Sequence, residues 1–445
     1  MDAEEVRRIV RETNYVTWRR QGGWDPLVVA RAQGSSFWDA DGREYLDFSS
    51  QLIATNLGHG NRRIAEAIAE QARTLAYAAP GFATEARARL SAALLDVLPK
   101  GLARFFFSTS GTEANEAALK IARAVTRRTK VLARYRSYHG ATAAAISVTG
   151  ELRRRAIEPL QKVPGTVFAP DCYCYRCPFG LSYPSCGVAC AEYVDYQLSR
   201  EGDVAAMIVE PVVGTNGVIV PVPEYLPRIR AITKKHDVLL IADEVMSGWG
   251  RVGEWFAVDR WGVVPDLLTT AKGITGAQIP LGLTATTAAV HDAFREAYFP
   301  HGHTYEAHPL TLAPGVAAIE EYRRLDLIAK SRTDGEYLLA RLREVGARHR
   351  SVGEVRGLGL FAAVELVRDR RTKEPLNTED DKIAGRPLVV DRVTAAMMKE
   401  GVFCIGWVSH LVVAPPLVVT REEIDRGVDV LDRALALADE HAVAG

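Results

Sequence analysis

Between about residues 61 and 325, the hydrophobic positions form short apolar runs separated by stretches of helical periodicity. The runs at 130–133, 206–209, 238–242 and 267–270 have the length and composition of buried strands. After residue 110, apolar side chains recur every three or four positions, which predicts a helix with one face packed on a sheet. Strands alternating with helices in this way predict an α/β architecture with a mainly parallel sheet.

The two ends of the chain have a different pattern. Residues 36–39 and 44–47 read as short strands joined by Asp41-Gly42, which is a hairpin signal. After residue 325 a long helical stretch is followed by mixed helices and strands. We therefore expect an N-terminal arm over residues 1–60, a large domain over 61–325 and a smaller α+β domain over 326–445. The polar stretch 369–386 is expected to be a mobile loop.

Composition narrows the possible partners. The chain has 445 residues with 48% hydrophobic content, which suffices for two or more domains. Lysine plus arginine equal aspartate plus glutamate at 55 each, so no global field favours nucleic acid or an anionic membrane. The N-terminus is charged, and no apolar run approaches the ~18 residues that span a bilayer. We expect a cytoplasmic protein that binds neither nucleic acid nor membrane.

Two residues at predicted strand ends suggest the chemistry. Asp243 ends the apolar run 238–242, and Lys272 follows the run 266–271 directly before Gly273. Desolvation of a lysine is costly unless its amine is deprotonated or covalently engaged, and the deprotonated amine reacts with carbonyl compounds. An acid and a lysine after successive strands are typical of a pyridoxal phosphate (PLP) site. Alone, such an aspartate would more often cap a helix, and such a lysine would be solvated.

A third feature is a possible phosphate cradle, which we define as residues 108–115. It lies between the apolar run 104–107 and the predicted helix, and it contains Ser110, Gly111 and Thr112. A helix start offers unpaired N–H groups and a positive dipole end, which bind phosphate. The alternative is an ordinary helix cap at Ser110 or Thr112. Together with Asp243 and Lys272, the phosphate-binding interpretation is favoured.

These motifs carry a family resemblance. The chain resembles the class III (omega-amino acid) aminotransferases of PLP fold type I from about Trp38 to Pro416. The matching motifs are Ser-Gly-Thr-Glu-Ala-Asn at 110–115, Ser-Tyr-His-Gly at 137–140, Ile-Val-Glu-Pro at 208–211, Ile-Ala-Asp-Glu-Val at 241–245, Ala-Lys-Gly at 271–273, Pro-Leu-Gly at 280–282 and His-Gly-His-Thr-Tyr at 301–305. The resemblance implies a mainly parallel, seven-stranded type of sheet in the large domain, and a smaller domain formed by both termini.

The resemblance also implies roles for individual residues. Lys272 and Asp243 would be catalytic: the lysine holds the cofactor aldehyde and moves the substrate proton, and the aspartate keeps the ring nitrogen protonated. Tyr138 would stack on one face of the ring and Val245 would close the other. Thr304 would reach the phosphate from the neighbouring subunit, which implies a homodimer, or a tetramer, with shared sites. The full cofactor-binding set is Ser110, Gly111, Thr112, Tyr138, His139, Glu210, Asp243, Val245, Lys272 and Thr304, with no metal ligand.

The expected reaction is a ping-pong transfer of an amino group from an amine donor to a 2-oxo acid acceptor. Residues 18–24, 49–56 and 175–180 resemble the branch that acts on taurine, beta-alanine and similar omega-amines, such as 4-aminobutyrate. In that branch Leu52 and Ile53 would line the mouth of the pocket, where apolar residues favour uncharged or extended amine substrates. The two positions at which a carboxylate-binding arginine would be sought hold Ile405 and Val412, so the group that binds the substrate carboxylate, and the partner of Glu210, stay open. The acceptor is expected to be pyruvate or 2-oxoglutarate.

The sequence leaves two alternative functions to consider. A PLP-dependent racemase, epimerase or aminomutase would return the amino group to the same molecule and would need no added 2-oxo acid. A non-enzymatic sensing or scaffold protein would keep its biological activity without Lys272. No DNA-binding helix pair or basic appendage supports this last alternative.

Cysteine usage poses a separate question. Five of the six cysteines lie within residues 172–190, namely Cys172, Cys174, Cys177, Cys186 and Cys190. Four of them have the spacing C-x2-C-x8-C-x3-C, which is compatible with a zinc or iron–sulfur site. Disulfides, credible in an oxidising compartment or in a hyperthermophile, and free thiols are equally open.

Overall fold

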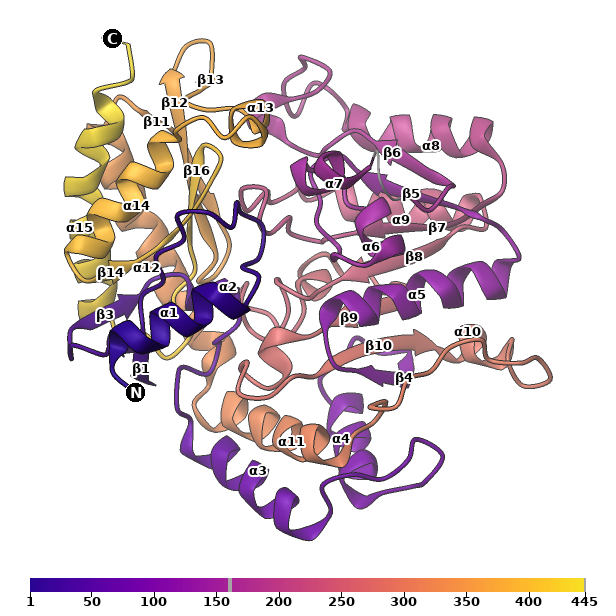
Figure 1. The fold of residues 1–445 in the computed structure, drawn as a ribbon. Coiled ribbons are helices and arrows are strands. Elements are labelled where there is room, and N and C mark those ends of the chain that lie inside the picture. Colours follow the sequence, from indigo (N-terminus) through magenta and orange to yellow (C-terminus); the bar gives the residue numbers. More distant parts are fainter. Residues whose placement is uncertain (159–161, 444–445) are drawn as a thin grey trace.

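The computed structural model describes residues 1–158 and 162–443. Its central element is a seven-stranded sheet in which only β10 runs antiparallel to its neighbours (Figure 1). In spatial order the strands are β4 (Leu102–Ser108), β10 (Gly282–Thr287), β9 (Leu267–Thr270), β8 (Leu239–Asp243), β7 (Val204–Val209), β5 (Lys130–Arg134) and β6 (Thr166–Ala169). The predicted α/β architecture with a mainly parallel, seven-stranded sheet is confirmed.

Helices cover both faces of this sheet. On one face α5 (Gly111–Thr126) buries its alanine-rich side against β10, β9 and β7, as its periodicity predicted. On the other face α8 (Ala189–Glu201) and α9 (Tyr225–Lys235) share a core with the strands β5 and β7. Because both faces are covered, the strands are apolar along their whole length rather than alternating.

Further helices flank the sheet. Two short helices, α6 (Ala143–Ser147) and α7 (Leu152–Ile157), follow β5, and α10 (Ala288–Asp292) follows β10. Below the sheet in Figure 1, α11 (Pro309–Arg324) packs against α3 (Arg62–Thr74) and α4 (Glu85–Leu95). The long helix α12 (Leu327–Arg348) then leads to the C-terminal part. Single 3-10 turns are η1 (Cys174–Arg176), η2 (Ala257–Trp261) and η3 (Lys272–Ile274).

The two ends of the chain meet in a smaller α+β region. One antiparallel sheet contains β11 (Val352–Gly357), β12 (Ala362–Asp369), β16 (His410–Val413) and β15 (Ile405–Trp407). A second sheet joins the N-terminal strands β1 (Val29–Gln33), β2 (Ser36–Asp39) and β3 (Glu44–Asp47) to β14 (Val402–Phe403). Helices α1 (Ala3–Thr13), α2 (Ser50–Ile53), α14 (Val389–Lys399) and α15 (Arg421–Asp439) complete the region. The predicted hairpin is confirmed, whereas the domain limits 1–60, 61–325 and 326–445 stay a prediction.

The expectation of a loop over residues 369–386 is wrong. The segment contains β13 (Glu374–Pro375), which pairs with β12, and the short helix α13 (Glu379–Ile383). Thr378 and Asp381 cap α13 reciprocally, and Asp380 accepts a hydrogen bond of 2.6 Å from Arg155 on α7. The polar residues that suggested a loop are therefore used in a helix cap and in an ion pair. In the described part of the chain, no helix is long and apolar enough to cross a membrane.

Candidate active site

Lys272 lies at the carboxyl end of β9, where the chain turns sharply. Its φ of +48° is in the left-handed region, and it begins the single turn η3. Within the described residues, neither a hydrogen bond nor an ion pair reaches its Nζ. Burial lowers the pKa of Lys272 from its ordinary value of 10.5 to about 8, although the carboxylates of Asp243 and Glu210 act in the opposite direction. The site therefore holds an unpaired amine that loses its proton near pH 8.

Asp243 lies at the end of β8, next to β9, and its carboxylate is buried and rigidly held. Oδ2 accepts a hydrogen bond of 2.8 Å from Asn115 Nδ2 and lies 2.8 Å from Nδ1 of His139. Oδ1 accepts from the backbone N–H of Val245 at 3.0 Å. Asn115 is fixed in turn by the hydroxyl of Thr269 on β9, at 2.6 Å. The carboxylate can thus face a ligand without reorienting.

The phosphate cradle forms the start of α5. Ser110 is the N-cap, and its Oγ accepts from the N–H of Glu113 at 3.2 Å, so the ordinary capping role also exists. A Cβ on Gly111 would lie 2.8 Å from a methyl carbon of Val245, and a Cβ on Gly140 would lie 2.6 Å from Oγ1 of Thr112. The fold therefore brings the cradle against the segments that carry Val245 and Tyr138. The first N–H groups of α5 have no partner within the helix and can bind an anion.

Glu210 follows β7, and its carboxylate accepts hydrogen bonds from backbone N–H groups rather than from an arginine side chain. Its Oε1 accepts from the backbone N–H of Tyr138 at 3.0 Å, and its Oε2 accepts from the N–H of Gly214 at 2.8 Å. Burial raises the pKa of this carboxyl group. Glu210 therefore fixes the backbone beside the tyrosine.

Ile405 and Val412, the positions at which a carboxylate-binding arginine would be sought, lie in an apolar cluster. Ile405 on β15 is paired in register with Val412 on β16, and Val412 is fully buried. The same cluster includes Ile53 and Phe361. An arginine at either position would have to displace these side chains. Leu52, next to Ile53, is 70% exposed.

Arg153 on α7 is a residue of this site that the sequence did not reveal. Its guanidinium carbon lies 3.9 Å from the ring centre of Tyr138, 4.4 Å from that of Trp407 and 5.4 Å from that of Trp18. Nε pairs with Glu151 at 2.6 Å, but Nη2 is buried and has no hydrogen-bond partner among the residues that the structure describes. Burial raises the pKa of Glu151 to about 7. In the sequence Arg153 opens a run of three arginines, which reads as a solvated helix face, so no signal distinguished it.

Thr304 is not brought to the other residues within the chain. It is exposed, and its carbonyl oxygen accepts from the hydroxyl of Tyr77 at 3.2 Å. A cavity of about 510 Å³ opens beside this segment rather than at Lys272, and Phe106, Phe299, His301 and His303 line part of it. The expected contact of Thr304 with the cofactor phosphate of a neighbouring subunit therefore stays a prediction.

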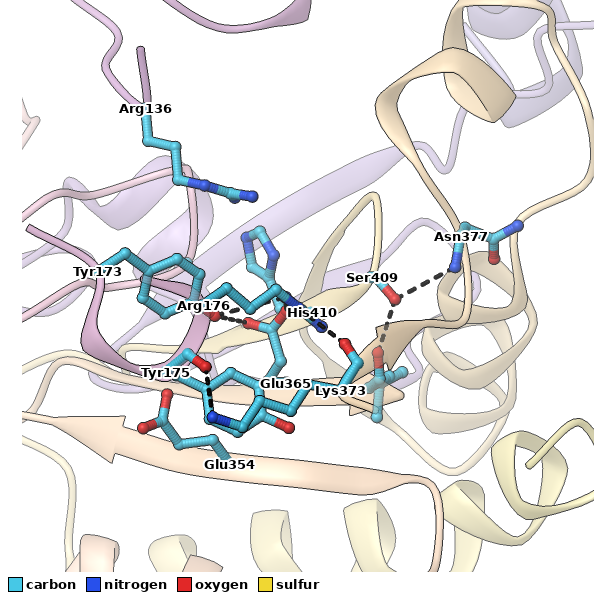
Figure 2. Close-up of polar contacts among 12 residues, drawn as sticks. Arg136, Tyr173, Tyr175, Arg176, Glu354, Glu365, Lys373, Asn377, Ser409 and His410 are labelled. Carbon is cyan, nitrogen blue, oxygen red and sulfur yellow. Dashed lines mark hydrogen bonds and ion pairs between the residues drawn. The ribbon is translucent and has the colours of Figure 1, made fainter. Parts of the chain in front are cut away.

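The cysteine-rich segment 172–190 makes contacts with the C-terminal sheet that involve its aromatic and basic residues (Figure 2). The hydroxyl of Tyr173 donates to Glu365 on β12 at 2.9 Å, Arg176 also pairs with Glu365, and Lys373 donates to the carbonyl of Tyr175 at 2.8 Å. All six cysteines are free thiols. Among residues 1–158 and 162–443, no group of three or more His, Cys, Asp or Glu is arranged to hold a metal ion.

The residues around Lys272 fit PLP. The unpaired amine can engage the aldehyde, the buried carboxylate of Asp243 can pair with the ring nitrogen, and the start of α5 can bind the phosphate. One face of the Tyr138 ring is covered by Arg153, which leaves the opposite face for a flat ligand.

Comparison with known proteins identifies relatives over nearly the whole chain. The family described as aminotransferase class-III matches residues 19–435. A leucine/methionine racemase of Thermococcus litoralis is 35% identical over 99% of this chain and 96% of its own. A taurine–pyruvate aminotransferase of Rhodobacter capsulatus is 36% identical over 92% of both chains. The solved structure of a taurine:2-oxoglutarate aminotransferase from Bifidobacterium kashiwanohense, in complex with PLP and glutamate, has a TM-score of 0.94 and 35% identity and covers 100% of this chain and 99% of its own.

Proposed function

Because this chain belongs to the class III aminotransferase family and uses PLP, we propose that it moves an amino group from an acidic omega-amine to a 2-oxo acid. The proposed donors are taurine, beta-alanine or a similar compound such as 4-aminobutyrate, and the acceptor is pyruvate or 2-oxoglutarate. The observation that carries the proposal is the unpaired amine of Lys272 beside the rigidly held carboxylate of Asp243.

When bound, PLP supplies an electron sink for the pair of electrons left when the substrate carbon loses its proton. The carboxylate of Asp243 is held in place by Asn115 and His139, and its negative charge would keep a proton on the ring nitrogen. Lys272, with its pKa near 8, takes the substrate proton and returns it at a different carbon. Tyr138 and Val245 would keep the ring plane fixed relative to that amine. The first turn of α5, with Ser110, Gly111 and Thr112, would hold the phosphate.

Arg153 is the group that we propose for recognition of the substrate's acidic end. Its buried Nη2 has no hydrogen-bond partner in the described part of the chain, and three aromatic rings surround the guanidinium. A carboxylate or sulfonate would satisfy that N–H with a charge-assisted hydrogen bond. This replaces the arginine that is absent at Ile405 and Val412.

The experiment is a donor–acceptor matrix with purified, PLP-loaded protein. Taurine, beta-alanine and 4-aminobutyrate are each combined with pyruvate and with 2-oxoglutarate, and the new amino acid is quantified. We expect at least one acidic donor to form alanine from pyruvate or glutamate from 2-oxoglutarate. In a separate reaction without acceptor, each active donor should change the visible absorbance of the cofactor. Absence of amino transfer from all omega-amines, α-amino acids and simple amines would contradict the proposal.

A second candidate is racemisation, which the similarity to the racemase of Thermococcus litoralis favours. The same Lys272 would return the proton to the carbon from which it came, and no 2-oxo acid would be consumed. Incubation of L-leucine and L-methionine without an acceptor, followed by chiral chromatography, separates the two functions. Appearance of the D-isomer there, with no transfer in the matrix, would favour the racemase.

Assembly and location belong to the same proposal. Thr304 is exposed next to the cavity beside Phe106, where a neighbouring subunit could place its cofactor phosphate, so we propose a homodimer with shared sites. Mixing a Lys272→Ala subunit with a Thr304→Ala subunit should restore some activity if the sites are shared. A cytoplasmic location stays a prediction that cell fractionation would test.

A further inference from the structure

A second positive charge lies over the same tryptophan that contacts Arg153. Lys382 is on α13, and its Nζ lies 4.7 Å from the ring centre of Trp407, whose centre is 4.4 Å from the guanidinium carbon of Arg153. The helices that carry the two cations, α13 and α7, lie side by side (Figure 1). Trp407 therefore has two cations around one indole ring.

Lys382 is half-buried, yet no carboxylate forms an ion pair with it in the described part of the chain. Burial lowers its pKa; Asp391 and Glu151 oppose this shift, and Arg153 and Arg19 add to it. Half-buried lysines usually have a charged partner, because desolvation of an unpaired ammonium is unfavourable. The charges that act on Lys382 are thus of both signs, and none of these carboxylates forms an ion pair with its ammonium group in the described part of the chain.

Two buried hydrogen-bond donors beside Lys382 have no acceptor within residues 1–158 and 162–443. They are Nη2 of Arg153 and Nε1 of the Trp407 indole. An unsatisfied buried donor costs about 1–3 kcal/mol, so natural structures keep few of them unless a ligand completes the site. Two such donors beside an unpaired lysine indicate a site for more negative charge than one carboxylate carries.

The position of Lys382 relative to Arg153 is fixed by the ends of the two helices. Arg155, two residues after Arg153, donates to Asp380 at 2.6 Å, and Asp380 is two residues before Lys382. On the other side, Arg20 donates to the carbonyl of Ala384 at 3.3 Å. The helix α13 is thus held over the site by contacts with both α7 and the N-terminal segment.

We propose that Lys382 and Trp407 form, with Arg153, a subsite for a second carboxylate, so that the enzyme prefers a dicarboxylic 2-oxo acid as acceptor over a monocarboxylic one. The inference rests on the proposed aminotransferase function and specifies its acceptor. Arg153 would bind one carboxylate, and Lys382 with Nε1 of Trp407 would bind the other. With the dicarboxylate bound, the buried donors and the lysine all have partners.

The test measures binding without turnover. Glutarate, a dicarboxylate that cannot react, and butyrate, a monocarboxylate, are titrated into PLP-loaded enzyme by calorimetry. We expect Lys382→Met to raise the Kd of glutarate about tenfold and to leave the Kd of butyrate within about twofold, since one charge pair is lost. Lys382→Arg should retain most of the glutarate affinity. Trp407→Phe, which keeps the ring but removes Nε1, should weaken glutarate binding selectively by a smaller factor.

The matched control is Lys373→Met. Lys373 also lies over an aromatic ring, 4.9 Å from the centre of Tyr175, but in the cluster of Figure 2. The Lys373→Met variant should bind glutarate and butyrate with the same Kd values as the unmodified enzyme. In turnover, Lys382→Met should raise the KM for 2-oxoglutarate and leave that for pyruvate unchanged. Equal weakening of glutarate and butyrate, or an unchanged glutarate Kd, would overturn the inference, whereas failure of amino transfer with intact glutarate selectivity would overturn only the proposed function.

Discussion

The proposed active site has two halves that are built in different ways. The cofactor half consists of Asp243, Lys272 and the phosphate cradle, and each of them follows a strand of one sheet. The acid-binding half consists of Trp18, Arg153, Lys382 and Trp407, which come from four distant segments. In the first half, the geometry is set by the sheet; in the second, it is set by how an N-terminal segment and a C-terminal sheet pack over that sheet. The proposed chemistry and the proposed substrate preference therefore depend on different parts of the fold.

The largest expected effect is on the cofactor half. Lys272→Ala removes the amine that moves the proton, and we expect a loss of about a thousandfold or more in the rate of the donor half-reaction. Stopped-flow absorbance of the loaded protein measures that rate. Lys399→Ala, at the end of α14, is the control and should react normally. A normal rate in Lys272→Ala would contradict the assignment of Lys272 as the amine that moves the proton.

Asp243→Asn should cost about a hundredfold in the same half-reaction, because the ring nitrogen loses its charged partner. The neighbouring Glu244 provides a matched control: it is buried, its Oε1 accepts from the N–H of Val258 at 2.8 Å, and burial raises its pKa to about 7. Glu244→Gln should change the rate by no more than a few-fold. Equal losses in the two variants would indicate a structural rather than a chemical role for Asp243.

The acid-binding half should affect substrate choice rather than chemistry. Arg153→Met is expected to raise the KM for an acidic donor about tenfold to a hundredfold, the range for loss of a hydrogen bond to a charged group. The KM for an uncharged amine such as 1-phenylethylamine should stay within about twofold. Arg154→Met is the control on the same helix, since Arg154 pairs with Glu158 outside the site. A loss of kcat with both donors would place Arg153 in the cofactor half.

The smallest effect is a shift on the pH axis. In cofactor-free protein, labelling of Lys272 by an acylating reagent should rise with pH around a midpoint near 8, because burial lowers its pKa and only the neutral amine reacts. An exposed lysine should label with a midpoint near its ordinary pKa of about 10.4. Peptide mass spectrometry across a pH series reads both midpoints in one sample. A Lys272 midpoint at the ordinary value would mean that the amine is solvated.

The difference between the halves explains what could be read from the sequence. Asp243 and Lys272 end apolar runs of strand length, so their meeting at one sheet edge followed from parallel topology alone. The pairing of β3 with β14, and the packing of Trp18 and Trp407 around Arg153, depend on contacts between residues that are more than a hundred positions apart. No local periodicity encodes such contacts, and an arginine in a run of three reads as a surface residue. The helix α13 was also missed. Its capping residues and its ion-pair partner Arg155 lie in polar sequence, which has the composition of a loop.

The central claim, that Lys272 is the residue that holds PLP, has a direct test. The PLP-loaded protein is treated with borohydride, which makes the link between cofactor and amine permanent, and is then digested and mapped by mass spectrometry. The account predicts a cofactor-sized mass on the peptide that contains Lys272 and on no other peptide, with loss of that signal in Lys272→Ala. A tag on a different lysine, or protein that binds no cofactor at all, would contradict it.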